Sequence, residues 1–162
     1  MQICSKYGNI LLRKPTPSRE WKEWYIILKL IIGLKGSGKT KQLIELANKA
    51  VEVSPGNVVC IEKSNKLTFD VNHKVRLVDT ESYGIANAQE LYGLVCGILA
   101  TNYDVKDLFI DSSLRICGDN IAEWVEFMGR LENLCKKYEV QCISTSSIDQ
   151  ADLPKALEQY VF

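Results

Sequence analysis

The strongest constraint on the fold is a glycine-rich stretch, Gly33-Leu34-Lys35-Gly36-Ser37-Gly38-Lys39-Thr40. An apolar, β-branched run over residues 26–32 comes directly before it and predicts a buried strand. Residues 39–53 come directly after it and predict a helix. Their apolar side chains recur on one helical face: Leu43, Ile44, Ala47, Ala50 and Val51. A buried strand, a glycine turn and an amphipathic helix in this order predict an α/β fold.

The same stretch fits the pattern G-x-x-x-x-G-K-[ST] in full. Glycines let the backbone curl so that successive N–H groups point at one anion, and the following helix adds its positive N-terminal end. Lys39 is expected to reach the β- and γ-phosphates of a nucleoside triphosphate, and the Thr40 hydroxyl to ligate Mg²⁺. No guanine-reading motif is present, so we expect ATP with Mg²⁺. The expected binding residues are Gly33, Leu34, Lys35, Gly36, Ser37, Gly38, Lys39, Thr40 and Lys41.

Asp111 ends a second apolar run, Leu108-Phe109-Ile110, about 70 residues after the glycine-rich stretch. An apolar strand that ends in Asp is typical of the carboxylate that holds Mg²⁺ in nucleotide-binding α/β proteins, usually through water. The alternative is a structural role in which Asp111 caps a turn or helix that begins at Ser112. The metal ligands expected from the sequence are therefore Thr40 and Asp111.

The remaining periodicity predicts an alternation of strands and helices. Strands are expected at residues 58–62, 75–78 and 140–145, and helices at 87–100, 120–138 and 153–159. Asn120 and Glu123 predict a capping box for the longest helix, and residues 160–162 a last edge strand. Residues 63–74 are polar and irregular, with a short extended piece expected at 67–71. This order predicts a three-layer α/β/α sandwich around a mainly parallel sheet of about five strands.

These motifs resemble those of P-loop NTPases of the RecA-like division, over residues 28–162. The chain is most similar to small bacterial ATP-binding proteins described as homologues of twitching-motility (PilT-like) ATPases. The resemblance implies a polar sensor of the γ-phosphate at the end of a later strand, with Thr145 or Ser146 as the candidate. Two features depart from the family pattern. Asp111 is followed by Ser112 and not by the usual glutamate, and the histidine box is missing.

Hydrolysis needs a group that activates water. Glu62 could do so if it faces the γ-phosphate; otherwise it is a solvated carboxylate at a strand end. Arg115 could act as an arginine finger; otherwise it forms a surface salt bridge. The sequence thus favours a slow ATPase or nucleotide-dependent switch. A non-hydrolysing ATP-binding module that acts through a protein partner is the main alternative. A small-molecule kinase is less favoured, because the chain has few arginines for a phosphate lid.

Composition limits the partners. Twenty basic residues balance twenty acidic ones, so no nucleic-acid binding is expected unless a local patch supplies it. Self-association or a protein partner remains open. No apolar run approaches the roughly 20 residues of a membrane-spanning helix. Six cysteines without a C-x-x-C pair indicate free thiols and a cytoplasmic location.

The pattern changes near residue 26. Residues 1–25 have no sustained period and are expected to be an N-terminal extension to the nucleotide-binding domain of residues 26–162. The extension is either a disordered or loosely docked arm, a basic and aromatic membrane-surface anchor, or a start-site artefact with translation beginning at Leu28.

Overall fold

The computed structural model describes residues 27–162. They form an α/β fold around one sheet of five strands in the order β1-β5-β4-β2-β3, and every pair of neighbouring strands is parallel. The expected extension at residues 1–25 lies outside the described residues. The strands are β1 (Leu28–Gly33), β2 (Asn57–Glu62), β3 (Arg76–Asp79), β4 (Val105–Ile110) and β5 (Gln141–Ser147).

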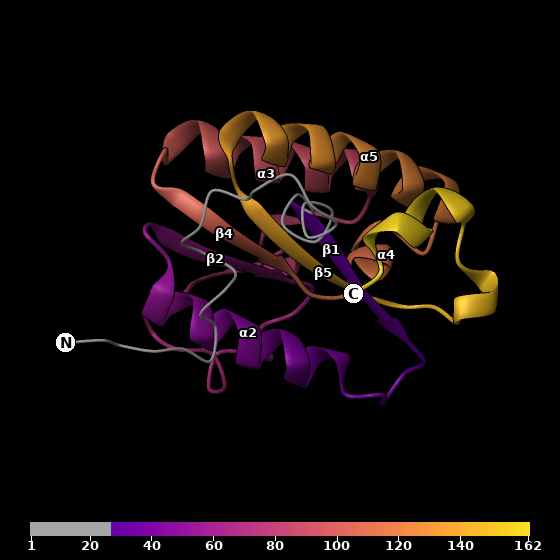
Figure 1. Cartoon of the computed structure of the whole chain (residues 1–162), viewed down its shortest axis with the longest axis horizontal. Helices are drawn as coiled ribbons and strands as arrows, with labels where there is room; N and C mark the ends of the chain where they lie inside the picture. The colour runs from indigo at the N-terminus through magenta and orange to yellow at the C-terminus, as the bar shows by residue number, and fades with distance from the viewer. Residues whose placement is uncertain (1–26) are drawn as a thin grey trace, which may run out of the picture.

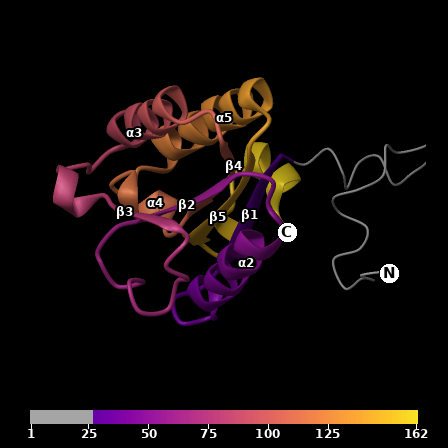
Figure 2. The same cartoon turned by 90° about the vertical axis from the view of Figure 1, so that its left-hand side faces the viewer.

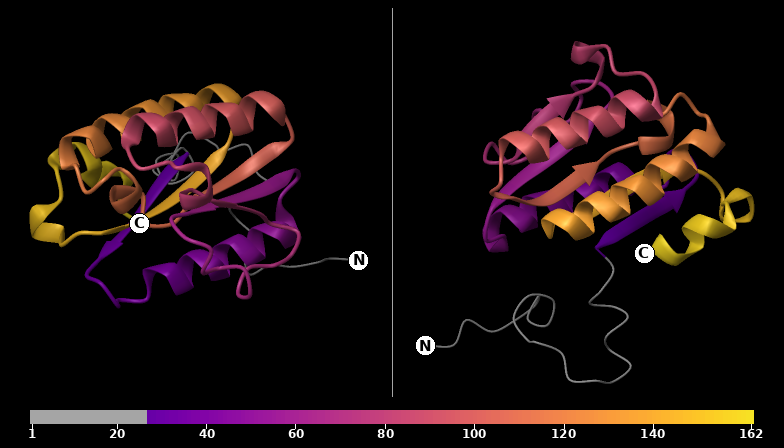
Figure 3. Two further views of the ribbon diagram at one scale, coloured as in Figure 1. Left: turned by 180° about the vertical axis from the view of Figure 1, so that it is seen from behind. Right: turned by 90° about the horizontal axis from the view of Figure 1, so that it is seen from above.

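Helices cover both faces of this sheet. Helix α2 (Lys39–Val53) lies on one face, and α3 (Ala88–Thr101) and α5 (Ile121–Tyr138) lie on the other (Figures 1 and 2). Helices α3 and α5 pack against each other (Figure 3). The short elements are α4 (Ser113–Ile116), η1 (Glu81–Tyr83), η2 (Gln150–Asp152) and η3 (Lys155–Tyr160). The three layers predicted from the sequence are therefore present.

Strand side chains alternate between two separate hydrophobic cores. On β2, Val59 and Ile61 join the core under α3 and α5, whereas Val58 and Cys60 join the core under α2. This alternation is the period of two that an extended strand imposes, applied to a strand buried on both faces. The α2 core is the smaller one, and its buried members are Leu43, Ala47, Val58, Cys60, Leu67, Val75 and Phe109.

The expected helices and strands are present with boundaries shifted by at most three residues in the long elements. Helix α2 has the predicted bounds. Asn120 caps α5, because its side chain accepts a hydrogen bond from the backbone N–H of Glu123. One expectation was wrong, because residues 67–71 form turns and not an extended piece. Helix α4 lies where a turn or helix after Asp111 was only an alternative, and its N-cap residue is Ser112, not Asp111.

The end of the chain lies at the outer edge of β1. Val161 forms one parallel bridge to Leu30, and the backbone N–H of Phe162 donates to the Leu30 carbonyl at 3.0 Å. The expected last strand is thus a single bridge. Within residues 27–162 the cysteines are free thiols, buried in every case except the half-buried Cys96. No helix in this described part is long and apolar enough to cross a membrane.

Candidate functional site

The glycine-rich loop connects the carboxyl end of β1 to the first turn of α2. Gly33, Gly36 and Gly38 have φ values of 152°, 83° and 86°, a region that favours glycine. A Cβ atom at Gly33 would lie 2.7 Å from the Ser37 hydroxyl oxygen, so a side chain there would require Ser37 to shift. At Gly36 and Gly38 a Cβ would meet nothing within 4 Å, so their backbone faces open space. The loop is therefore curled, and the backbone at Gly36 and Gly38 is open to an approaching ligand.

The side chain of Lys39 folds back over this loop. Its Nζ donates to the carbonyl oxygens of Gly33 at 2.8 Å and Leu34 at 2.7 Å, and to the Ser37 hydroxyl at 3.3 Å. The residue is 8% exposed. Burial lowers the pKa of Lys39, and the nearby Asp111 carboxylate opposes that shift. The neutral carbonyls hold an ammonium group at the loop, where phosphate oxygens would be stronger acceptors.

Asp111 follows β4, and its carboxylate links the glycine-rich loop to β5 through hydrogen bonds. Its Oδ1 accepts hydrogen bonds from the Thr40 hydroxyl at 3.0 Å and the Thr145 hydroxyl at 2.8 Å. Its Oδ2 accepts from the Ser112 hydroxyl at 3.1 Å. Because β5 lies between β1 and β4, the carboxyl ends of these three strands meet at one edge of the sheet. Such an edge is where ligands bind in open α/β sheets.

Thr40 and Asp111 fit a magnesium ion by chemistry. Both offer hard oxygen ligands, and Mg²⁺ takes one or two protein oxygens with phosphates and water completing the shell. Their oxygens lie 3.0 Å apart, joined by a hydrogen bond from the Thr40 hydroxyl to Asp111 Oδ1. No cluster of three or more His, Cys, Asp or Glu side chains within residues 27–162 could hold a metal ion by itself.

Of the two sensor candidates, Thr145 is the one that contacts Asp111. Its hydroxyl also accepts from the backbone N–H of Ser112 at 2.8 Å. Ser146 is fully buried and turns the other way, toward Ser113 at 2.9 Å. Ser112 has a φ of 58°, an uncommon value for a residue with a side chain. Ser112 is the residue between Asp111 and the first residue of α4, and the chain turns there through a left-handed conformation.

A buried hydroxyl network adjoins this edge of the sheet, and no sequence pattern predicted it. Ser113 Oγ accepts from Trp124 Nε1 at 2.9 Å and from the Ser144 hydroxyl at 2.8 Å. All three residues are completely buried. Serines near an expected sensor strand were visible in the sequence, but only the packing of α5 brings Trp124 to them.

Glu62 lies at the carboxyl end of β2 and is only 2% exposed. The interpretation of this residue as a solvated carboxylate was therefore wrong. Its carboxylate accepts from the backbone N–H groups of Lys66 at 3.0 Å and Leu67 at 3.2 Å. Burial raises the pKa of Glu62, these two hydrogen bonds lower it, and the neighbouring carboxylates of Asp79 and Asp111 raise it further. The Glu62 side chain thus fixes the start of the segment that follows β2 through the backbone of Lys66 and Leu67.

A pocket of about 530 Å³ opens beside the glycine-rich loop. Its lining has four basic side chains and one acidic side chain, and comprises Lys35, Gly36, Gly38, Lys39, Thr40, Lys41, Ser112, Leu114, Arg115, Asp119 and Ser147. Arg115 is exposed and forms no ion pair with another residue of the described range 27–162. The surface salt bridge expected for Arg115 is thus absent. Leu34 does not line the pocket and is 63% exposed.

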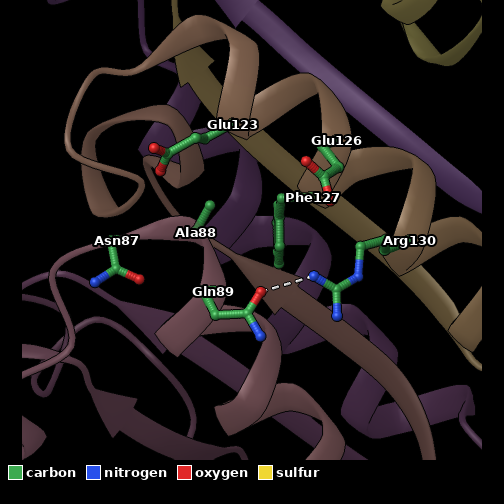
Figure 4. Close-up of a pocket in the computed structure, with 7 residues that line it drawn as sticks. All are labelled: Asn87, Ala88, Gln89, Glu123, Glu126, Phe127 and Arg130. Carbon is green, nitrogen blue, oxygen red and sulfur yellow. Dashed lines mark hydrogen bonds between the residues drawn. The ribbon is translucent and has the colours of Figure 1, made fainter.

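A second pocket, of about 450 Å³, lies between α3 and α5 and contains none of the expected site residues. Glu123 and Glu126 stand on one side, and Arg130 donates to the Gln89 side-chain oxygen at 2.8 Å (Figure 4). The Arg130 guanidinium also stacks on the Tyr92 ring, with its carbon 3.8 Å from the ring centroid. The carboxylates of Glu123 and Glu126 would repel a phosphate group, so this second pocket does not suit one.

Comparison of the sequence with models of known protein families finds no match, and comparison with curated proteins finds none either. A functional assignment therefore rests on the site itself.

Proposed function

We propose that this chain binds a nucleoside triphosphate with Mg²⁺, with ATP as the expected nucleotide, and acts as a slow ATPase or nucleotide-dependent switch. The observation that carries the proposal is the meeting of Thr40 and Asp111, which lie 71 residues apart in the chain and 3.0 Å apart in space. They adjoin a glycine-rich loop whose backbone and lysine are suited to phosphate oxygens.

Charge and topology support a triphosphate as the ligand. Lys35, Lys39, Lys41 and Arg115 line the pocket against Asp119 alone, which favours a ligand with several negative charges. The position of β5 between β1 and β4 supports a P-loop NTPase fold of the RecA-like division. In this proposal the loop, Gly33 to Thr40, cradles the phosphates, and Thr40 and Asp111 hold the metal ion. The Mg²⁺ would neutralise charge that develops on the phosphates.

A non-hydrolysing module that acts through a protein partner is the second candidate, and Glu62 favours it. This residue is 2% exposed, its carboxylate accepts from the backbone N–H groups of Lys66 and Leu67, and it does not line the pocket beside the glycine-rich loop, so it is not placed to activate water there. Ser112 stands where a water-activating glutamate would follow Asp111. Thr145 and Arg115 remain in the proposal as a sensor of the γ-phosphate and a cation near it. We therefore expect turnover to be slow, if it occurs.

The test is ATP binding and phosphate release by the full chain, with and without Mg²⁺. Lys39→Ala is the site variant, and Lys155→Ala is the matched control, because Lys155 is an exposed lysine on η3. Binding that Lys39→Ala weakens at least about tenfold and Lys155→Ala leaves unchanged supports the site. Phosphate release sensitive to the same substitution indicates an ATPase, and binding without release indicates the module. Equal binding by all three proteins refutes the proposal.

A further inference from the structure

The segment between β2 and β3 carries an unusual set of side chains. We call residues 63–76 the β2–β3 crossover, which includes the first residue of β3. Its basic side chains are Lys63, Lys66, Lys74 and Arg76, with His73 beside them, and its one acidic residue is Asp70. In its middle stands Phe69, which is 98% exposed. A large aromatic side chain in full contact with water costs free energy unless something covers it.

The backbone that presents Phe69 is held firmly. Glu62 binds the base of the crossover through the N–H groups of Lys66 and Leu67. Asn48 of α2 donates to the Asp70 carbonyl at 3.0 Å and accepts from the Asn72 N–H at 2.7 Å. Leu67 and Val75 are buried in the α2 core on either side. Phe69 is therefore exposed on an anchored turn. A ligand that binds there would not have to order the backbone of this turn, so little conformational entropy would be lost on binding.

The basic side chains of the crossover are not engaged by acids. No ion pair within residues 27–162 involves one of them. Lys63 donates to a neutral acceptor, the Arg115 carbonyl, at 3.1 Å. Lys66, Lys74 and Arg76 are exposed, and Arg76 pairs with Val59, so these cations are spread along the crossover. The segment thus carries four basic side chains against one acidic one, although the net charge of the chain is balanced.

We propose that the β2–β3 crossover binds single-stranded nucleic acid, with Phe69 stacked on a base and the exposed basic side chains along the crossover on phosphates. Stacking on an aromatic side chain together with basic contacts to the backbone is how single strands are bound without sequence preference. The neighbours of Phe69 in the chain, Thr68 and Asp70, are polar and exposed. A protein partner would need an apolar surround that excludes water from the anchor, whereas a base needs only one face of the ring.

The experiment measures fluorescence anisotropy of a labelled oligothymidine of about 20 nucleotides with the full chain at low salt, without ATP. Phe69→Ala should weaken binding at least about fivefold, the lower limit for losing one stacked base, and Phe69→Trp should retain it. Tyr103→Ala is the matched control, because Tyr103 is 80% exposed in the connection between α3 and β4. Lys66→Ala should reduce the slope of log affinity against log salt by about 0.7.

Three results would overturn the proposal. One is no binding of the oligonucleotide. Another is equal loss in the Phe69 and Tyr103 variants. The third is binding of duplex DNA or polyglutamate as tight as that of the single strand, which would indicate charge alone or an acidic protein partner. The outcome is separable from that of the nucleotide site, because Lys39→Ala should bind the oligonucleotide like the wild type. The Phe69, Tyr103 and Lys66 variants should keep the wild-type melting temperature, since the replaced side chains are exposed.

Discussion

Replacing Ser113 by alanine removes one oxygen from a completely buried network, and the structure predicts which partner loses most. Ser144 can still donate to the Ile110 carbonyl at 3.3 Å, and Ser146 to the Thr145 carbonyl at 2.8 Å. The indole of Trp124 has only one N–H donor, and its hydrogen bond to Ser113 is the one it makes. That N–H group would be left unsatisfied in the core beneath the proposed metal site.

The cost follows from this single orphaned donor. An unsatisfied buried donor costs about 1–3 kcal/mol. In a domain of this size that corresponds to a fall in melting temperature of roughly 2–4 °C per kcal/mol. We therefore expect Ser113→Ala to lower the free energy of unfolding by about 1–3 kcal/mol.

A double-mutant cycle in urea isolates this effect. Trp124→Phe removes the donor itself, so in that background Ser113→Ala orphans nothing, and its cost should fall by about 1 kcal/mol. A cost of Ser113→Ala below about 0.5 kcal/mol would refute the argument, since that is the range of neutral surface substitutions. The same cost in both backgrounds would refute it as well, because the two residues would then not be coupled.

Three further predictions concern the site. Asp111→Asn should weaken Mg-ATP binding by about 10- to 100-fold and leave Mg-free ATP binding nearly unchanged, as measured by calorimetric titration; equal loss in both would count against a metal role. Gly33→Ala should weaken ATP binding, because a φ of 152° is strained for a residue with a Cβ and the Ser37 hydroxyl, 2.7 Å from that Cβ, would have to move; Gly93→Ala on α3, where a Cβ meets nothing within 4 Å, is the control. Glu62→Gln should change how stability depends on pH. The folded-state pKa of Glu62 is raised above its ordinary value of 4.5 by burial first, so its stabilising contribution is complete below pH 4.5 and is lost as pH rises through the raised pKa. The free energy of unfolding of the wild type, measured in urea, should therefore fall with rising pH relative to that of the variant. Parallel curves of this free energy against pH would contradict the prediction.

Much of the fold was predictable because its signals are local. The bounds of α2 follow from Gly38 before it and from one apolar face along it, and Asn120 caps α5 as its sequence position indicates. The parallel sheet follows from the alternation of strands and helices. The order of the strands does not, because no periodicity records that β5 enters between β1 and β4. Helix α4 has four residues, too few for a period to appear.

The site divides in the same way. Lys39 and Thr40 belong to a motif that is contiguous in the chain, so their positions could be predicted. Asp111 required only the end of an apolar strand. Glu62 was misjudged because its burial depends on backbone N–H groups four and five residues later, which fold back over it and carry no side-chain signature. Trp124 was missed because its partner Ser113 lies on another element.

The unequal size of the two hydrophobic cores has a consequence for how the domain opens. Helix α2, with the glycine-rich loop at its start, is attached to the sheet through the smaller core. Layers with fewer buried contacts exchange their amide hydrogens through local openings of lower free energy than global unfolding. A ligand held by both Thr40 on α2 and Asp111, directly after β4, would fix that layer to the sheet and slow its exchange far more than that of α5. Without a ligand, the α2 layer would thus open more readily than the layer of α3 and α5, and a bound ligand would slow its hydrogen exchange more.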